Sequence, residues 1–306
     1  MNRRGLAVLV LVLAAAGCGG GGGGDKERGK IVFYSDRDGP FELYVMNAAG
    51  SGATRLTTTG RREDVGTNRE RAALWPHWSP DGSRIVFQVG PPDLFAGQIH
   101  VVAADGSGKE RLTKPADGHN VFPAWSPDGS RIVFASDRGG DFDLYVMSAD
   151  GSGARRLVRL PDDQVQPEWS PDGSMIVFKC DRKDGADICV IRSDGTGLRR
   201  LTRSPGEDLS PDWSPDGEGI VFSREVGEEI DVYTIAADGT GLRRLTGAPH
   251  VEVFASWSPD GREIVFASDR DGGTELYVMN ADGSGQRRLT RAQGKDILPD
   301  WAPGSV

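Results

Sequence analysis

The sequence predicts an all-β fold, a six-bladed β-propeller with four antiparallel strands per blade, from three observations. The motif Trp-Ser-Pro-Asp-Gly recurs, with the last four copies 44 residues apart, beginning at Trp78, Trp125, Trp169, Trp213 and Trp257. Short apolar or alternating runs separated by turn residues follow each copy, a pattern typical of strands. The chain also opens with three strands of a unit and closes with one. A four-stranded repeat of this length is typical of a propeller blade.

The N-terminus has the layout of an export signal. Arg3 and Arg4 precede an apolar run, residues 6–13, which is followed by small residues and Cys18. This order predicts a lipoprotein signal peptide over residues 1–17, and the run is short for a membrane-spanning helix. We expect Cys18 to be lipidated and the glycine-rich residues 18–29 to form a flexible tether. Plain cleavage near Ala16, with Cys18 remaining a thiol, is the alternative.

The propeller domain is expected over residues 30–306. It opens with strands predicted at 31–35, 42–47 and 54–57 and closes with a lone strand that ends at Trp301. We expect this last strand to complete the N-terminal blade and close the ring, because the exchange removes exposed sheet edges. Within each unit, Ser-Pro-Asp-Gly predicts the turn after the first strand. Asp-Gly-Ser-Gly or Asp-Gly-Thr-Gly predicts the hairpin turn after the third.

The ordered pattern Pro-x-Trp-Ser-Pro-Asp-Gly, Ile-Val-Phe-x-Ser-Asp-Arg, Leu-Tyr-Val-Met and Leu-Thr resembles the repeat of the TolB-type β-propeller family, also called the WD40-like Pro-Asp repeat. The resemblance covers Lys30 to Val306 and implies the fold. It does not imply one function, because the family includes periplasmic scaffolds, sensor ectodomains and non-catalytic halves of peptidases. The TolB translocation protein carries an additional N-terminal α/β domain, which we do not expect here, so the Tol–Pal role is not implied.

The first strand of each unit should border the central channel, where two positions vary between units. Five residues before each Trp lie Ala73, Asn120, Gln164, Asp208, Glu252 and Asp296. One residue before it lie His77, Ala124, Glu168, Asp212, Ser256 and Asp300. Carboxylate and amide oxygens that converge on an axis suit Ca²⁺ or another cation, an amine or a peptide end. A water-filled channel with a polar lining is the alternative. The recurring Trp side chains are expected to pack between blades.

Two irregularities in the period are further candidates. The linker between Thr57 and Trp78 is about ten residues longer than its counterparts. Its basic residues, expected over the channel mouth as a lid or partner-binding loop, are Arg61, Arg62, Arg69 and Arg71. A solvated insertion is the alternative. In the second unit Phe95 replaces regular turn residues, and it is either an exposed anchor for a partner or packed on its own blade.

Histidines and cysteines suggest two more sites. His77, His119 and His250 all shortly precede innermost strands. Their placement resembles that of the Mn²⁺-binding histidines of TolB-like oligogalacturonate lyases, although their offsets from Trp differ, so a metal site there is only a weak candidate. Cys180 and Cys189 fall on neighbouring strands of one hairpin, at positions expected to lie opposite each other, and an oxidising compartment favours a disulfide. Two buried thiols are the alternative.

Composition and motifs narrow the function. A formal net charge of -9 offers no basic field for a phosphate backbone, so we expect no nucleic-acid partner. The sequence contains no Gly-x-Ser-x-Gly, His-Glu-x-x-His, phosphate-loop or Cys-x-x-Cys motif. We therefore expect a monomeric, non-catalytic cell-envelope lipoprotein that binds a protein, peptide or glycan at the channel mouth and meets the membrane only through its lipid. The alternatives are a metal-dependent polysaccharide lyase or hydrolase acting at the funnel, and a sensor or transport-associated ectodomain.

Overall fold

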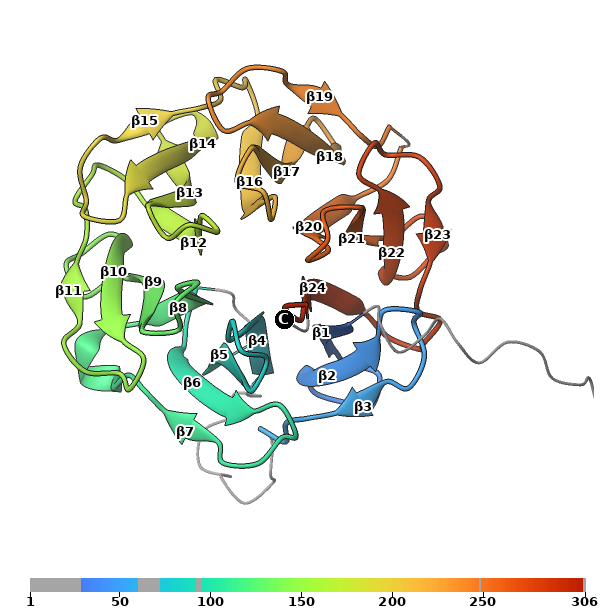
Figure 1. Ribbon diagram of the computed structural model, residues 1–306, viewed down its shortest axis with the longest axis horizontal. Coiled ribbons are helices and arrows are strands. Elements are labelled where there is room, and N and C mark those ends of the chain that lie inside the picture. The colour runs from blue at the N-terminus through green and yellow to red at the C-terminus, as the bar shows by residue number, and fades with distance from the viewer. Residues whose placement is uncertain (1–28, 60–71, 92–94, 248, 305–306) are drawn as a thin grey trace, which may run out of the picture.

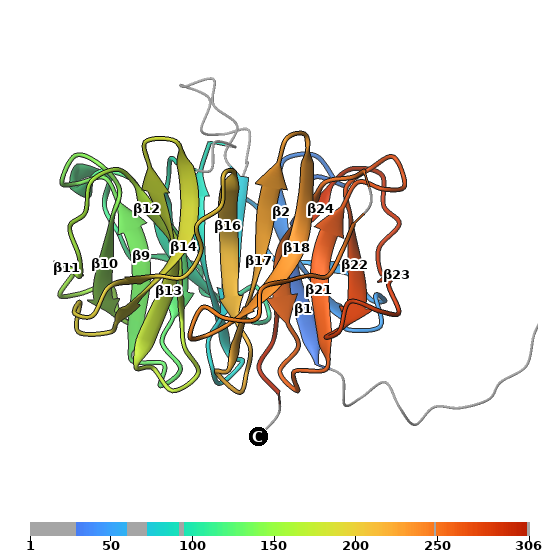
Figure 2. The same cartoon turned by 90° about the horizontal axis from the view of Figure 1, so that it is seen from above.

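The protein is described here from a computed structural model that places residues 29–59, 72–91, 95–247 and 249–304. Its sheets stand radially around a central axis (Figure 1), and their strands run roughly along that axis (Figure 2). The predicted all-β class and antiparallel sheets are confirmed, and a short 3₁₀ helix, η1 (Pro115–Asp117), is the only helix among the described residues. That part of the chain contains no helix with the length and apolarity needed to cross a membrane.

Six strands lie nearest the axis. They are β4 (Ala72–Trp78), β8 (Asn120–Trp125), β12 (Gln164–Trp169), β16 (Glu207–Trp213), β20 (Glu252–Trp257) and β24 (Asp296–Trp301). The second strands, which pair with them, are β1 (Lys30–Ser35), β5 (Arg84–Gly90), β9 (Arg131–Ser136), β13 (Met175–Arg182), β17 (Gly219–Val226) and β21 (Glu263–Ser268).

The third strands are β2 (Glu42–Asn47), β6 (Gln98–Ala103), β10 (Asp143–Ser148), β14 (Gly185–Arg192), β18 (Glu229–Ala236) and β22 (Glu275–Asn280). The outer strands are β3 (Thr54–Arg55), β7 (Glu110–Arg111), β11 (Arg155–Arg156), β15 (Arg199–Arg200), β19 (Arg243–Arg244) and β23 (Arg287–Arg288). Each has only two residues, so the perimeter of the molecule presents very short sheet edges.

The last strand of the chain belongs to the sheet of the first three. β24 pairs antiparallel with β1, from Ile31 opposite Trp301 to Ser35 opposite Asp296, and the sheet order is β24-β1-β2-β3. The two ends of the described chain are thus held in one sheet by backbone hydrogen bonds.

A single parallel bridge, Ala186 to Glu207, links the sheets β12–β15 and β16–β19 into one hydrogen-bonded path.

The recurring tryptophans fill the spaces between neighbouring sheets. Trp125 is 2% exposed and packs on Val86 and Ile99 of the preceding sheet as well as on Ile132 of its own. The guanidinium of Arg84 lies 4.8 Å from the Trp125 ring centroid. This placement matches the expected packing role and buries a large apolar surface at each junction.

Every innermost strand carries a bulge three residues before its Trp. At this position the backbone has φ between 51° and 58°, and the residues are Trp75, Phe122, Gln166, Ser210, Phe254 and Leu298. The pairing with the second strand shifts register at the same place in all six sheets. A left-handed backbone costs a non-glycine residue about 1–2 kcal/mol, so the surrounding sheets must hold these residues in place.

Candidate binding site on the central axis

Two cavities lie on the axis, because each is lined by residues of all six innermost strands. One, the bulge cavity, is lined by the six bulge residues and the residues that follow them. The other, the tryptophan cavity, is lined by the six recurring Trp residues and by the Pro of each Ser-Pro-Asp-Gly turn or its counterpart. Four side chains line both cavities and therefore lie between them: His77, Glu168, Asp212 and Asp300. We call these four the axial cluster.

The bulge cavity has an apolar side and a polar side. Trp75 meets Phe122 edge-on with ring centroids 4.8 Å apart, and Phe254 edge-on at 5.5 Å. On β12 and β16, Gln166 accepts a hydrogen bond from the backbone N–H of Ser210 at 2.8 Å. The cavity therefore offers aromatic surface and polar groups to one ligand.

The bulge residues were not predicted from the sequence to line a cavity. One signal was present: this position changes between Trp, Phe, Gln, Ser and Leu from unit to unit and directly precedes Pro in five of the six. Phe95 extends the aromatic side outward, with its ring centroid 5.4 Å from Phe122 and 5.8 Å from Phe142. It is 40% exposed, and both of these rings belong to the next unit and not to its own blade. Its role as an anchor for a partner stays a prediction.

The axial cluster connects neighbouring sheets. The backbone N–H of Trp78 donates to Asp300 Oδ2 at 2.9 Å, and that of Trp257 donates to Asp212 Oδ2 at 2.8 Å. His77 on β4 likewise binds the backbone of β8, since its Nδ1 accepts the Trp125 N–H at 3.2 Å. Asp300, Asp212 and His77, each directly before a recurring Trp, thus bind the backbone of the following unit, a structural role that was not predicted from the sequence.

Glu168 departs from this pattern and reaches across the axis. Its Oε1 lies 3.1 Å from His77 Nε2 and also accepts the N–H of Trp169 at 3.0 Å. The strand between them, β8, has the small residue Ala124 at the equivalent position. The cluster therefore holds three carboxyl groups and one imidazole near one another.

Burial and mutual repulsion set the charge of the cluster. Desolvation and the nearby Glu168 raise the pKa of Asp212 to about 8, and desolvation raises that of Asp300 to about 6. Burial lowers the pKa of His77 and Glu168 and Asp300 raise it, but the hydrogen bond at Nδ1 decides the charge of the ring. Protonation of Nδ1 would set two N–H groups against each other, because Trp125 already donates there. The geometry therefore holds a neutral ring with its proton on Nε2.

The raised pKa of Asp212 predicts a pH-dependent gain from Asp212→Asn. A carboxyl whose pKa rises from 3.8 to about 8 on folding contributes stability below its unfolded pKa that is lost as pH rises through about 8. We expect the variant to match the parent at pH 4 and to exceed its unfolding free energy at pH 9 by up to about 5–6 kcal/mol, at about 1.4 kcal/mol for each pKa unit. Urea unfolding at both pH values measures this. Asp184→Asn, at an exposed turn, is the charge-matched control, and an equal shift at both pH values would contradict the argument.

The positions five residues before Trp are enclosed and paired with arginine. Asn120, Asp208, Glu252 and Asp296 are all fully buried. Arg138 donates to Asn120 at 2.7 Å, Arg37 to Asp296 at 2.6 Å, and Arg224 to both oxygens of Asp208 at 2.6 and 2.8 Å, while Arg270 contacts Glu252. None of them lines either axial cavity. The expectation that they face a channel ligand is corrected: they stabilise the sheets.

Gln164 and Ala73 are the two remaining residues five positions before Trp, and both are uncharged. Gln164 is buried and donates to the backbone oxygens of Pro161 and Asp162, and no arginine of the described ranges bonds to it. Ala73 is buried in β4, and its pairing partner in β5 is Val89. At the positions five residues before Trp, the side chain is therefore neutral in both sheets where no described arginine pairs with it.

The three histidines are not brought together. His77 lies in the axial cluster, His250 Nδ1 lies 3.8 Å from Asp269, and the backbone of His119 donates to Asp137 at 2.6 Å. Over the described ranges, no three His, Cys, Asp or Glu side chains approach one another as metal ligands would. The residues present thus do not fit a histidine metal site.

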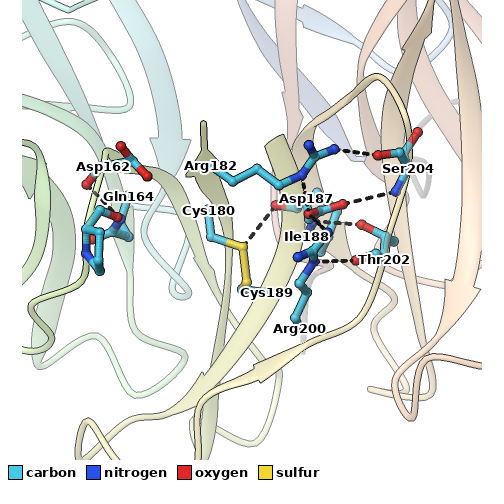
Figure 3. Close-up of a disulfide and its surroundings, with 11 residues drawn as sticks. Asp162, Gln164, Cys180, Arg182, Asp187, Ile188, Cys189, Arg200, Thr202 and Ser204 are labelled. Atoms are coloured by element: carbon cyan, nitrogen blue, oxygen red, sulfur yellow. Dashed lines mark hydrogen bonds and ion pairs between the residues drawn. A yellow bond between two sulfur atoms is a disulfide. The ribbon is translucent and has the colours of Figure 1, made fainter. Parts of the chain in front are cut away.

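Cys180 and Cys189 form the expected disulfide, with Cα atoms 5.9 Å apart (Figure 3). One detail differs from the expectation. Cys180 lies opposite Asp187 and Cys189 opposite Phe178, so the two cysteines are diagonal rather than directly opposite. Diagonal neighbours on one sheet face are still within reach of each other.

Five predicted site residues lie outside the described residues: Cys18, Arg61, Arg62, Arg69 and Arg71. The signal peptide, most of the tether and most of the long loop fall there too.

The family model of the TolB β-propeller domain, PD40, matches residues 57–160, 158–246 and 205–305. This chain belongs to the TolB β-propeller family. The resemblance inferred from its repeat is thereby confirmed. No curated protein matched the chain.

Solved structures agree on the fold of this TolB-family chain. TolB from Acinetobacter baumannii has a TM-score of 0.73 at 22% identity, covering 90% of this chain and 67% of that one. A putative TolB from Agrobacterium tumefaciens has a TM-score of 0.68 at 21% identity, with 90% and 92% covered. An oligogalacturonate lyase in complex with manganese has a TM-score of 0.57 at 19% identity, with 86% and 74% covered. At these identities the similarity concerns the fold.

Proposed function

We propose that this chain is a non-catalytic, exported cell-envelope scaffold that binds a protein, peptide or glycan through the central channel. The observation that carries the proposal is the bulge cavity. The side chains that the innermost strands contribute to it at the bulge vary between Trp, Phe, Gln, Ser and Leu, whereas the residues that repeat are used in turns, sheet junctions and buried pairs. A concave site with aromatic walls and a few polar groups is suited to recognition.

The proposal includes a ring of six four-stranded units closed by β24, with anchoring through a lipidated Cys18. The pairing of β24 with β1 and the four-strand order of the sheets support the ring. The order of Arg3, Arg4, the apolar run and Cys18 supports export and lipidation. A lipid tether would leave both faces of the ring open to partners in the envelope.

Filling the bulge cavity should weaken ligand binding. Leu298→Trp places at one bulge a residue that already occupies another, Trp75, and so narrows the cavity without a new backbone demand. The purified chain is screened against a displayed peptide library and an immobilised glycan array. We expect the ligands it selects to lose at least roughly tenfold in affinity for the variant, about 1.4 kcal/mol.

The matched control is Leu198→Trp, the same substitution at a residue that is 45% exposed away from both axial cavities. Thermal unfolding of both variants checks that the fold is retained. Ligands that bind Leu298→Trp as well as the parent, or no selected ligand at all, would refute channel binding.

A further inference from the structure

Three carboxyl groups next to the bulge cavity have no lysine or arginine partner. Asp212 and Asp300 each use one oxygen to accept a backbone N–H, and Glu168 uses Oε1 for Trp169 and His77. In the part of the chain that the structure describes, no Lys or Arg forms an ion pair with any of the three, and none lines the cavity. Elsewhere in this protein buried carboxylates meet arginines, as Asp208 meets Arg224. The axial carboxyl groups are therefore left for a ligand to neutralise.

The opposite wall of the same cavity is aromatic. Trp75, Phe122 and Phe254 line it together, with Leu298 beside them. The face of an indole or phenyl ring attracts a cation, most strongly where water is excluded. Aromatic and acidic groups in one cavity are the combination that recognises an organic ammonium ion.

A buried hydroxyl adds a third, independent indication of a ligand. Ser210 lines the cavity and is 7% exposed, and its Oγ has no hydrogen-bond partner among the described residues. The indole Nε1 of Trp75 is also buried without a partner there. A buried polar group without a partner is costly. The hydroxyl can accept from an ammonium N–H, and the indole can donate to a neighbouring carbonyl oxygen of the same ligand.

From these contacts we propose that the bulge cavity binds an alkylammonium group, carried either by a lysine side chain or by a free organic amine. The inference rests on the proposed channel-binding function and specifies the chemistry of its ligand. A hard cation such as Ca²⁺ fits less well, because it needs six to eight oxygen ligands. Half of this wall is aromatic, and the described acidic groups do not converge as a metal site.

Affinity for the ammonium group should rise with pH. The titratable groups that face the site are His77 on β4, Glu168 on β12, Asp212 on β16 and Asp300 on β24, while β8 and β20 contribute Ala124 and Ser256 at the equivalent positions. Because the pKa of Asp212 lies at about 8, its carboxyl is largely protonated at pH 6 and ionised at pH 9. A bound cation favours the ionised form, so binding should release a proton at neutral pH.

The test is calorimetric titration of the purified full-length chain at pH 9 with four probes. Nα-acetyl-lysine methylamide represents a lysine side chain, n-butylammonium a free amine, Nα-acetyl-norleucine methylamide the same chain without charge, and CaCl₂ a hard cation. We expect one or both ammonium probes to bind and norleucine to show no binding. Preference for acetyl-lysine methylamide over butylammonium would assign the peptide source, and the reverse would assign the free amine.

Two variants locate the binding. Asp212→Asn keeps an oxygen for the Trp257 N–H but removes the charge, and Trp75→Leu inserts the residue found at the bulge of β24. Each should weaken ammonium binding roughly tenfold, whereas Asp184→Asn should leave it unchanged. Asp300→Asn replaces Asp212→Asn if that variant fails to fold.

Binding of norleucine as strong as that of lysine, binding of Ca²⁺ alone, or affinity unchanged in the cavity variants would overturn the proposal. Its failure is distinguishable from failure of the proposed function. Ligands selected by the chain and lost in Leu298→Trp would remain evidence for channel binding even if they carried no ammonium group.

Discussion

Replacing Arg224 with methionine should lower the free energy of unfolding by about 3–5 kcal/mol, because it leaves a buried carboxylate without a partner. Asp208 is fully enclosed, and both of its oxygens accept hydrogen bonds from the Arg224 guanidinium at 2.6 and 2.8 Å. The same guanidinium lies 5.0 Å from the Tyr233 ring centroid. Urea-induced unfolding followed by tryptophan fluorescence measures the loss.

Two companion variants separate this effect from a general loss of charge. Arg262→Met removes an arginine that is 84% exposed and lies 3.9 Å from Asp260, and it should change stability by less than about 1 kcal/mol. Adding Asp208→Ala to Arg224→Met should recover part of the loss, because β4 folds with Ala73 at this position. A double variant no more stable than Arg224→Met would show that the buried charge is not the cause.

Removing the disulfide should lower the unfolding free energy by about 2–3 kcal/mol, because the bond restricts the unfolded chain. The bond closes a short loop, with the two cysteines nine residues apart in sequence, and joins neighbouring strands β13 and β14. Cys180→Ser combined with Cys189→Ala deletes it at buried positions with little change in volume. Chemical unfolding of parent and double variant measures the difference.

Reductant provides the control for this prediction. Dithiothreitol should lower the unfolding midpoint of the parent toward that of the double variant and leave the double variant unchanged. A parent that is insensitive to reductant, or a double variant as stable as the parent, would rule out a stabilising role for the bond. The hairpin around the disulfide also contains Asp187, whose carboxylate contacts Arg182 and Arg200 (Figure 3), so residual stability in the double variant is expected.

The positions one and five residues before each recurring Trp, both predicted from the sequence to line the channel, show how much of the site could be predicted. Of the six residues one before Trp, all except Ala124 line an axial cavity, whereas those five before Trp line neither cavity. In a regular strand, positions one and five residues before Trp lie on the same face. The bulge three residues before Trp sets two residues of the inner strand against one of its partner, as at Phe122 and Pro123, so the alternation reverses.

The sequence alone determined the strands, the turns and the family, because these depend on short-range patterns that recur in every unit. The Ser-Pro-Asp-Gly turn, for instance, is stabilised locally: Asp81 accepts from Ser79 and Ser83, which lowers its pKa to about 2. It also determined that Cys180 and Cys189 share a hairpin. The tertiary structure alone decided which side chains meet at the axis. Glu168 reaches His77 from a strand two sheets away, and Trp75 reaches Phe254. Such contacts depend on how the sheets are arranged around the axis and on one strained backbone position in each inner strand. The Pro after five of these positions is a local signal, but no local pattern shows which side chains meet.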